Sequence, residues 1–312
     1  MNLLLSSLAA GVGQGAVYAL IAVSFVIIYR ATGVLNFAQP ALLILGTFAA
    51  SVFATQLGWG FWLAAPLAML VIALLSVGIE RVAIRPLVGR PQFSAAIVTV
   101  GLFIALLVVA FRLFDSQPRT VDDPWQLRSV CLGGTATESF GVTGCDGGVQ
   151  IYENAIARFV IALAVIGLLG WWLTRSRLGL AMRATSLDQE TALAQGISVG
   201  RMFSISWAIG GALAALAGVL LAANGSVVQA TDALFALVAL PAIIIGGLDS
   251  LKGAVLGGLI VGLAMALTKT YQTVYAPWLG TNFENVVPYL LMILVLLVRP
   301  YGIFGTREVQ RV

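Results

Sequence analysis

The sequence contains no histidine among its 312 residues. This absence excludes histidine acid–base catalysis, Ser-His-Asp triads and the usual histidine metal sites. A G-x-x-x-x-G-K-[ST] phosphate loop is also missing, so the chain does not hydrolyse ATP by that route. We therefore expect a protein that is not an enzyme and that has no catalytic residue, metal or cofactor.

Charged residues are scarce as well. They make up 10% of the chain, whereas soluble domains carry about 25%, and 60% of the residues are hydrophobic. The apolar runs are continuous rather than alternating, which favours membrane-spanning helices over a β-barrel. The sequence predicts one all-α membrane domain over residues 1–312 with about nine spans, within a range of eight to ten. The runs are 3–28, 34–55, 61–79, 93–114, 155–173, 203–223, 233–245, 254–267 and 286–298.

Arginine and lysine gather in alternate loops, which indicates the orientation of the chain. These loops lie around residues 30, 81–90, 175–201, 252 and 299–311. The positive-inside rule places them in the cytoplasm, with the N-terminus outside and the C-terminus inside. The hydrophilic segment 115–154 is then an extracytoplasmic insert. Its Cys131 and Cys145 can form a disulfide in an oxidising compartment, and two free thiols are the alternative.

Two pairs of spans are interrupted in a similar way. A polar break with Asn36 and Gln39, followed by Pro40, separates the first span from the second. Another break begins at Asn224, and Pro241 lies in the next span. Because the predicted orientation reverses between the pairs, they suggest an inverted repeat with interrupted helices, as in transporters. Chance is the alternative, since glycine-rich spans recur in most membrane bundles.

Neutral polar side chains in or near these spans are the candidates for lining a substrate pathway. For serine and threonine, a hydrogen bond to their own helix is the simpler interpretation. Amides beside a broken helix need other partners. The candidates are Gln14, Tyr18, Asn36, Gln39 and Asn224. We expect no buried Asp, Glu or Arg within a span, which argues against an ion-coupled transporter.

The basic loop from residue 174 to residue 202 carries signals for a short helix. Ser186 and Gln189 fit a capping box, acidic residues follow in the first turn, and Gly196 supplies a C-terminal stop. The pattern predicts a helix over Leu187–Gln195 in a cytoplasmic loop. Either this helix docks a partner protein, or the loop is a solvated connector.

Several stretches together resemble one known family. They are GVGQGAVYALIAVSFVIIYRATGVLNFAQPALLILGTFAA, IERVAIRPL, SRLGLAMRATSLDQETALAQGISVGR, AALAGVLLA, IIIGGLDSLKGAVLGGLIVGLAMAL and LVLLVRPYGIFG. The chain resembles the permease subunits of branched-chain amino-acid ABC importers over nearly its whole length except 115–154. It departs from the family pattern at Pro40, which follows Gln39, and in the cysteine-containing insert.

The resemblance implies a role and partners. The protein would be the smaller of two permease subunits in a bacterial cytoplasmic membrane, in a heterodimer with the second permease. Two cytoplasmic ATPases and an extracytoplasmic substrate-binding protein would complete the system, which would transport leucine and similar amino acids. The loop 174–202 resembles the ATPase-contacting loop, with candidate coupling residues Arg183, Ser186, Leu187, Asp188, Glu190, Ala192, Leu193 and Gly196.

Other functions remain open from the residues. Relatives of this family also serve urea, short amides and other amino acids. An ATPase-independent secondary transporter would take up substrate alone. A membrane-embedded enzyme would need clustered carboxylates, His or Cys at the membrane face, which the sequence does not supply.

Overall fold

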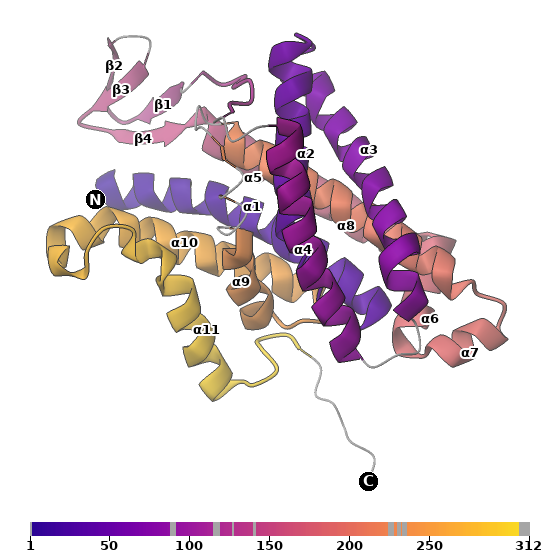
Figure 1. Ribbon diagram of the computed structural model, residues 1–312. Coiled ribbons are helices and arrows are strands. Elements are labelled where there is room, and N and C mark those ends of the chain that lie inside the picture. The colour runs from indigo at the N-terminus through magenta and orange to yellow at the C-terminus, as the bar shows by residue number, and fades with distance from the viewer. Residues whose placement is uncertain are drawn as a thin grey trace.

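Helix α1 (Asn2–Thr32) forms the centre of the molecule. The computed structural model describes residues 2–87, 92–114, 119–126, 128–139, 142–223, 228–229, 232 and 236–305. From Gly15 to Ile28 every residue of α1 is buried. Helix α10 (Leu251–Tyr275) runs along it (Figure 1). Gly15 and Gly262 allow this close approach, because a Cβ added at Gly262 would collide with the backbone of Gly15.

The remaining long helices surround this pair, and each begins or ends at the polar or glycine-rich breaks of the sequence. Helix α8 packs on α1, α2 and α3, and α5 packs on α1. The further apolar helices are α2 (Gln39–Ser51), α3 (Phe61–Ile79), α4 (Gln92–Phe114), α5 (Glu153–Arg175), α8 (Val199–Ala222), α9 (Ala239–Gly246) and α11 (Val287–Val298). The π-helical turns η1 (Val52–Gln56) and η2 (Glu80–Ile84) extend α2 and α3, and short 3₁₀ turns lie at Arg85–Leu87, Pro277–Leu279 and Phe283–Asn285.

Seven helices in the described part of the chain are long and apolar enough to span a membrane. Two shorter apolar helices, Ala236–Gly246 and Phe283–Val298, correspond to the seventh and ninth predicted runs. The eight residues of α9 rise only about 12 Å, well short of the roughly 30 Å hydrocarbon core. A polytopic helical membrane protein is therefore confirmed, while the nine predicted spans divide into seven long helices and two short ones.

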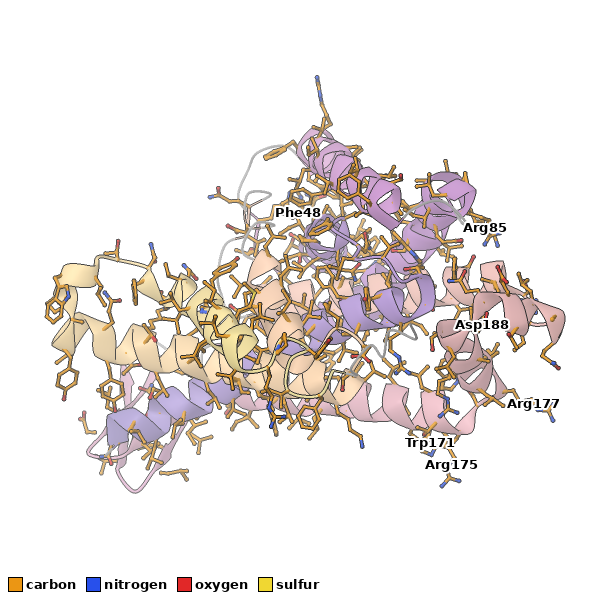
Figure 2. The ribbon with its side chains drawn as sticks, turned by 90° about the horizontal axis from the view of Figure 1, so that it is seen from below. Phe48, Arg85, Trp171, Arg175, Arg177 and Asp188 are labelled. Carbon is orange, nitrogen blue, oxygen red and sulfur yellow. A yellow bond between two sulfur atoms is a disulfide. The ribbon has the colours of Figure 1, made fainter. Side chains whose placement is uncertain are left out.

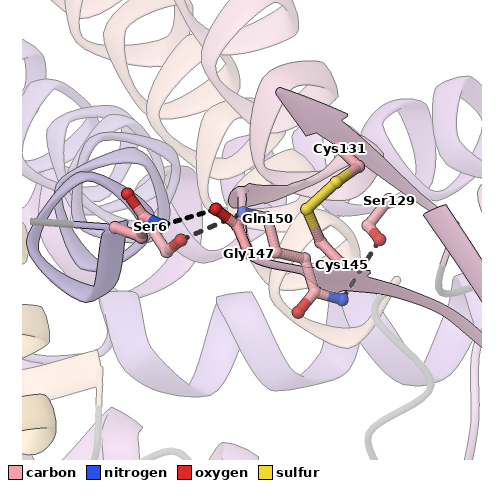
Figure 3. The surroundings of a disulfide bond; sticks show 7 residues. Ser6, Ser129, Cys131, Cys145, Gly147 and Gln150 are labelled. Atoms are coloured by element: carbon pink, nitrogen blue, oxygen red, sulfur yellow. Dashed lines mark hydrogen bonds between the residues drawn. A yellow bond between two sulfur atoms is a disulfide. The ribbon is translucent and has the colours of Figure 1, made fainter. Parts of the chain in front are cut away.

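The insert departs from the all-α prediction, because it contains four strands. β1 (Ser129–Leu132) pairs antiparallel with β4 (Val149–Tyr152), and β2 (Thr135–Ser139) pairs antiparallel with β3 (Val142–Asp146). The disulfide between Cys131 and Cys145 joins β1 to β3 (Figure 3), so the predicted bridge is confirmed. The strands contain Val, Thr, Ile and Tyr, which favour strand over helix.

The insert is held against the first turns of α1. The side-chain amide of Asn2 donates to the carbonyl of Gly147 (2.9 Å), and the backbone N–H of Gln150 donates to the Ser6 hydroxyl (3.2 Å; Figure 3). We call this end of the molecule the strand end. The opposite end, with α6 (Arg177–Leu187) and α7 (Gln189–Ala194), is the loop end (Figure 1).

Candidate functional site

Asn36 and Gln39 form a buried polar lock where the chain breaks between α1 and α2. The Asn36 amide donates to Gln39 Oε1 (2.8 Å), and the Gln39 amide donates to the Ser24 hydroxyl (2.9 Å) and to the Gly210 carbonyl (2.8 Å). Asn36 Oδ1 accepts from the backbone N–H of Ala38 (3.1 Å). Both side chains are at most 1% exposed. Their hydrogen bonds tie α1, α2 and α8 together.

This lock has a local cause. Helix α1 ends at Thr32 because Gly33 adopts φ +72°, and Pro40 at the start of α2 has no backbone N–H. The chain therefore cannot continue as one helix, and the side chains beside the break supply hydrogen bonds that a helix would have made. Thr99 of α4 joins them, because its hydroxyl accepts from the backbone N–H of Phe37 (3.2 Å).

Gln14 and Tyr18 instead line a cavity, which we call the strand-side cavity. It measures about 290 Å³ and opens between α1, α2, α8 and α10 in the half nearer to the strands. The Gln14 amide donates to the Tyr18 hydroxyl (3.0 Å). Of the five predicted pathway residues, these two line the cavity, Asn36 and Gln39 do not, and Asn224 lies outside the described residues. Apolar walls come from Leu43, Ile44, Leu221, Val228, Val238 and Met265.

Charged side chains of both signs lie at the polar side of the strand-side cavity. Lys269 comes from α10, Glu284 from the 3₁₀ turn before α11, and Asp232 from the segment before α9. Asp232 Oδ2 accepts from the backbone N–H of Gln229 (2.8 Å), which fixes its position. The cavity thus combines aliphatic walls with an amide, a phenol and opposite charges.

The expectation that no charge is buried was wrong for two residues. Glu80 is fully buried, and Arg158 in α5 is only 8% exposed. Two nitrogens of Arg158 (Nε and Nη2) have no hydrogen-bond partner in the described structure, nor does Oδ2 of Asp123, whose charge interacts with that of Arg158. Arg158 stands inside the predicted run 155–173, so the sequence contained this signal. Glu80 was assigned to a loop because its apolar run ends at Ile79.

Glu80 belongs to a staple between η2 and α8. Arg85 donates to both oxygens of Glu80 (3.1 and 3.0 Å), and it also donates to the Gly200 carbonyl (2.8 Å). The Ser204 hydroxyl donates to Glu80 Oε2 (2.7 Å). Since the charge is paired and hydrogen-bonded, its burial is tolerated. The staple lies at the loop end, where Arg85 and Asp188 are both found (Figure 2).

The loop 174–202 folds into two helices rather than the single predicted helix Leu187–Gln195. Leu187 is the last residue of α6, and α7 covers Gln189–Ala194. The N-cap is Asp188 instead of Ser186. Asp188 Oδ1 accepts from the N–H groups of Glu190 (2.9 Å) and Thr191 (3.1 Å), whereas the Ser186 hydroxyl donates back to the Arg183 carbonyl. A carboxylate at this position also meets the helix dipole, which accounts for the preference.

The predicted stop of this helix is confirmed. Gly196 has φ +80°, and its N–H donates to the Leu193 carbonyl (2.9 Å), while the N–H of Ile197 donates to the Ala192 carbonyl (3.0 Å). These bonds satisfy carbonyls at the helix end, and glycine adopts the positive φ without strain.

The two leucines of the coupling candidates are exposed and the alanine is not. Leu187 is 88% exposed and Leu193 58% exposed, whereas Ala192 is buried. Leu187 at the end of α6 and Leu193 in α7 therefore present apolar side chains to the surface on either side of the Asp188 cap. A substitution at Ala192 therefore tests the packing of α7 on the rest of the protein, and one at Leu193 tests the exposed surface of α7.

Taken together, the helices, the strand-side cavity and the exposed helix α7 define a polytopic membrane protein with features of a transport subunit. The described residues contain no group of three or more Cys, Asp or Glu side chains that could hold a metal ion.

Comparison with known proteins identifies the family. Residues 7–296 match the family described as the permease component of branched-chain amino acid transport systems, and the chain belongs to this family. It is therefore a transport subunit and not an enzyme.

Curated relatives agree over nearly full length. The chain is 33% identical to the high-affinity branched-chain amino acid transport system permease protein BraD of Pseudomonas aeruginosa, covering 99% of this chain and 98% of that protein. It is 32% identical to LivH of Escherichia coli, covering 97% and 96%. It is 30% identical to a probable LivH of Methanocaldococcus jannaschii, covering 92% and 88%. No solved structure gives a significant match.

Proposed function

We propose that the protein carries branched-chain amino acids across a bacterial cytoplasmic membrane as the smaller permease of an ABC importer. The strand-side cavity is the observation that supports this substrate class. Its aliphatic walls suit an aliphatic side chain, and its opposite charges, Lys269 and Glu284, suit the two ends of a zwitterion. Its volume of about 290 Å³ fits a small ligand.

The proposed orientation of the protein in the membrane follows from the charges at its two ends. Arg85, Arg175 and Arg177 extend from the loop end (Figure 2), which the positive-inside rule assigns to the cytoplasm. The strand end, with its disulfide, then faces the oxidising side, where a binding protein would deliver the amino acid. Nine crossings, seven by the long helices and two that include the short apolar helices Ala236–Gly246 and Phe283–Val298, would put the N-terminus outside and the C-terminus inside. An inverted repeat of α1–α2 and α8–α9 fits this arrangement.

Energy would come from two ATPases that dock at α7. Among the described residues, the two buried charges, Glu80 and Arg158, do not form a chain across the spans, since Glu80 is already paired with Arg85. The exposed Leu187 and Leu193 on either side of the Asp188 cap offer a surface for an ATPase subunit. A second permease would complete the translocation path.

Reconstituted uptake tests the substrate and the energy source together. The permease is co-expressed with the second permease and both ATPases, and proteoliposomes are assayed for uptake of leucine, isoleucine and valine against urea and acetamide. We expect uptake of the branched-chain amino acids that needs ATP and the binding protein. Uptake by this chain alone would contradict the proposal and identify a secondary transporter. Uptake confined to urea or acetamide would overturn the substrate class.

A matched pair of variants tests the docking helix. Leu193→Asp places a charge on the exposed face of α7, and Leu132→Asp places the same charge on exposed β1 at the other end. We expect Leu193→Asp to weaken co-purification of the ATPase subunits at least about tenfold, equivalent to about 1.4 kcal/mol of binding free energy. Leu132→Asp should leave co-purification unchanged. Equal co-purification with the two variants would remove α7 from the ATPase contact.

A further inference from the structure

A second cavity lies at the loop end, between α1, α5, α6 and α10, and we call it the loop-side cavity. It measures about 450 Å³, larger than the strand-side cavity. Its walls are mostly apolar and include Ile27, Leu173, Met182 and Leu251. None of the proposed transport steps uses this cavity, because the substrate pathway residues lie in the opposite half of α1.

Among the described residues, three cationic side chains and no carboxylate line the loop-side cavity. Arg30 comes from the last turn of α1, Arg183 from α6 and Lys252 from the first turn of α10. None of the three lies within 4 Å of a carboxylate in the described part of the chain. Asp249 attracts Arg30 from outside, since it lines a neighbouring cavity with Tyr29, while Arg183 repels Arg30. Arg30 and Arg183 are partly buried and Lys252 is exposed, so the three like charges lie between the apolar recess and solvent, where they repel one another and attract an anion.

The position of the loop-side cavity relates it to the membrane surface. Trp171, which is 61% exposed, lines it and stands near Arg175 and Arg177 (Figure 2). Tryptophan favours the boundary between hydrocarbon and headgroups. Helix α5, which supplies this wall, has one of the least buried spans, so the recess borders the hydrocarbon. A ligand here would meet apolar walls on one side and cations on the other.

We propose that the loop-side cavity binds an anionic phospholipid, with its phosphate between Arg30, Arg183 and Lys252 and the start of an acyl chain against the apolar wall. A free phosphate would satisfy the cations only, and a zwitterionic lipid would bring its own cation into a site that already has three. Basic recesses between spans at the cytoplasmic surface suit anionic headgroups. The lipid would hold α6 against α1 and α10 and would fix the position from which α7 extends.

Two double variants with the same change in net charge test this site. Arg183→Gln/Lys252→Gln removes two charges from the cavity, and Arg175→Gln/Arg177→Gln removes two exposed charges from the same end. Native mass spectrometry of the purified full-length protein measures binding of phosphatidylglycerol and phosphatidylcholine. We expect the first pair to weaken phosphatidylglycerol binding about fivefold per charge removed, and the control pair to change it less than about twofold.

Three results would each overturn the lipid site. Equal losses in the two double variants would indicate general surface attraction. Equal binding of phosphatidylcholine and phosphatidylglycerol would remove the role of charge. Competition by inorganic phosphate or glycerol 3-phosphate as strong as that of the lipid would assign the cavity to a soluble anion instead.

A spectroscopic measurement covers the case in which a charge variant fails to fold. The difference in fluorescence between the parent protein and Trp171→Phe gives the contribution of Trp171. Phosphatidylglycerol with brominated acyl chains should quench this contribution more strongly than brominated phosphatidylcholine does. Equal quenching by both lipids would contradict the proposal. These measurements involve neither amino acid nor ATPase, so their outcome is independent of the transport proposal.

Discussion

Gln39 and Gln14 have chemically identical side chains on consecutive helices, but Gln39 ties helices together and Gln14 lines a cavity. Gln39 is completely buried, and its amide donates to Ser24 and Gly210 while its oxygen accepts from Asn36. Gln14 is partly exposed on a cavity wall, with a single hydrogen bond to Tyr18 among the described residues. An amide in a membrane protein contributes to ligand binding only when it keeps hydrogen-bonding capacity that the protein itself does not use.

The largest effect is expected from Gln39→Leu. It would leave the Asn36 amide buried without a partner, at about 1–3 kcal/mol, and would remove the hydrogen bonds of Gln39 to Ser24 and to the Gly210 carbonyl, at about 1 kcal/mol each. We expect a loss of about 3 kcal/mol in the free energy of unfolding, measured by thermal unfolding of the purified protein in detergent. Gln14→Leu is the matched control and should unfold within a few degrees of the parent. Similar stability of the two variants would show that the buried hydrogen bonds of Gln39 contribute no more to stability than the single hydrogen bond of Gln14.

Glu80→Gln extends the comparison to a buried charge. The glutamine keeps the volume and one acceptor but loses the ion pair with Arg85, so we expect a loss of about 2 kcal/mol. A double-mutant cycle with Arg85→Gln measures the pairing directly, with a coupling of about 1 kcal/mol because Arg85 is 41% exposed. Strictly additive losses would show that the two residues do not stabilise one another.

Gln14→Leu and Tyr18→Phe should change transport instead of stability. Each removes one polar group from the strand-side cavity, and a single hydrogen bond to a ligand contributes about 1 kcal/mol. We expect KM for leucine uptake to rise about fivefold with little change in thermal unfolding. The measurement is ATP-dependent uptake in proteoliposomes. Unchanged KM in both variants would move the pathway away from this cavity.

The smallest effect concerns the cap of α7. Hydrogen bonds from the Thr191 side chain and from backbone N–H groups hold the pKa of Asp188 below its ordinary value of 3.8. Because the folded pKa is depressed, the stabilisation of α7 is present above pH 3.8 and is lost as the pH falls through the lower, folded value. Hydrogen exchange of residues 189–194 between about pH 2.5 and pH 7 measures it. Asp188→Asn, which caps without titrating, should remove this pH dependence; a dependence that persists would locate it elsewhere.

Sequence patterns predicted the parts of the fold that depend on composition over long windows. All the long spans, the disulfide and the Gly196 stop were found in this way, because each follows from hydropathy, spacing or backbone preference. The cap was misplaced by two residues, since Ser186 and Asp188 are both good N-caps but Ser186 lies within α6, which continues to Leu187.

Side-chain partners across helices could not be predicted in the same way. Gln39 is separated by 171 residues from Gly210, and Glu80 by 124 residues from Ser204. Whether an amide or a carboxylate faces a partner or a cavity depends on the relative rotation of two packed helices, which hydropathy does not fix. Composition and breaks in the spans identified Gln14 and Gln39 as candidates. Only the packing of the helices shows that Gln39 belongs to the buried lock and Gln14 to the cavity wall.

The contacts that fasten the insert to the start of α1 also set an order of assembly. Asn2 and Gly147 are 145 residues apart, so the first turn of the central helix has no partner in the insert until about half of the chain has been synthesised. At about 5–20 residues per second, that delay is about seven to thirty seconds. During this interval α1 also lacks α5, α8 and α10, the helices that pack on it in the finished protein. The central helix therefore gains most of its partners only when the second half of the chain has been made.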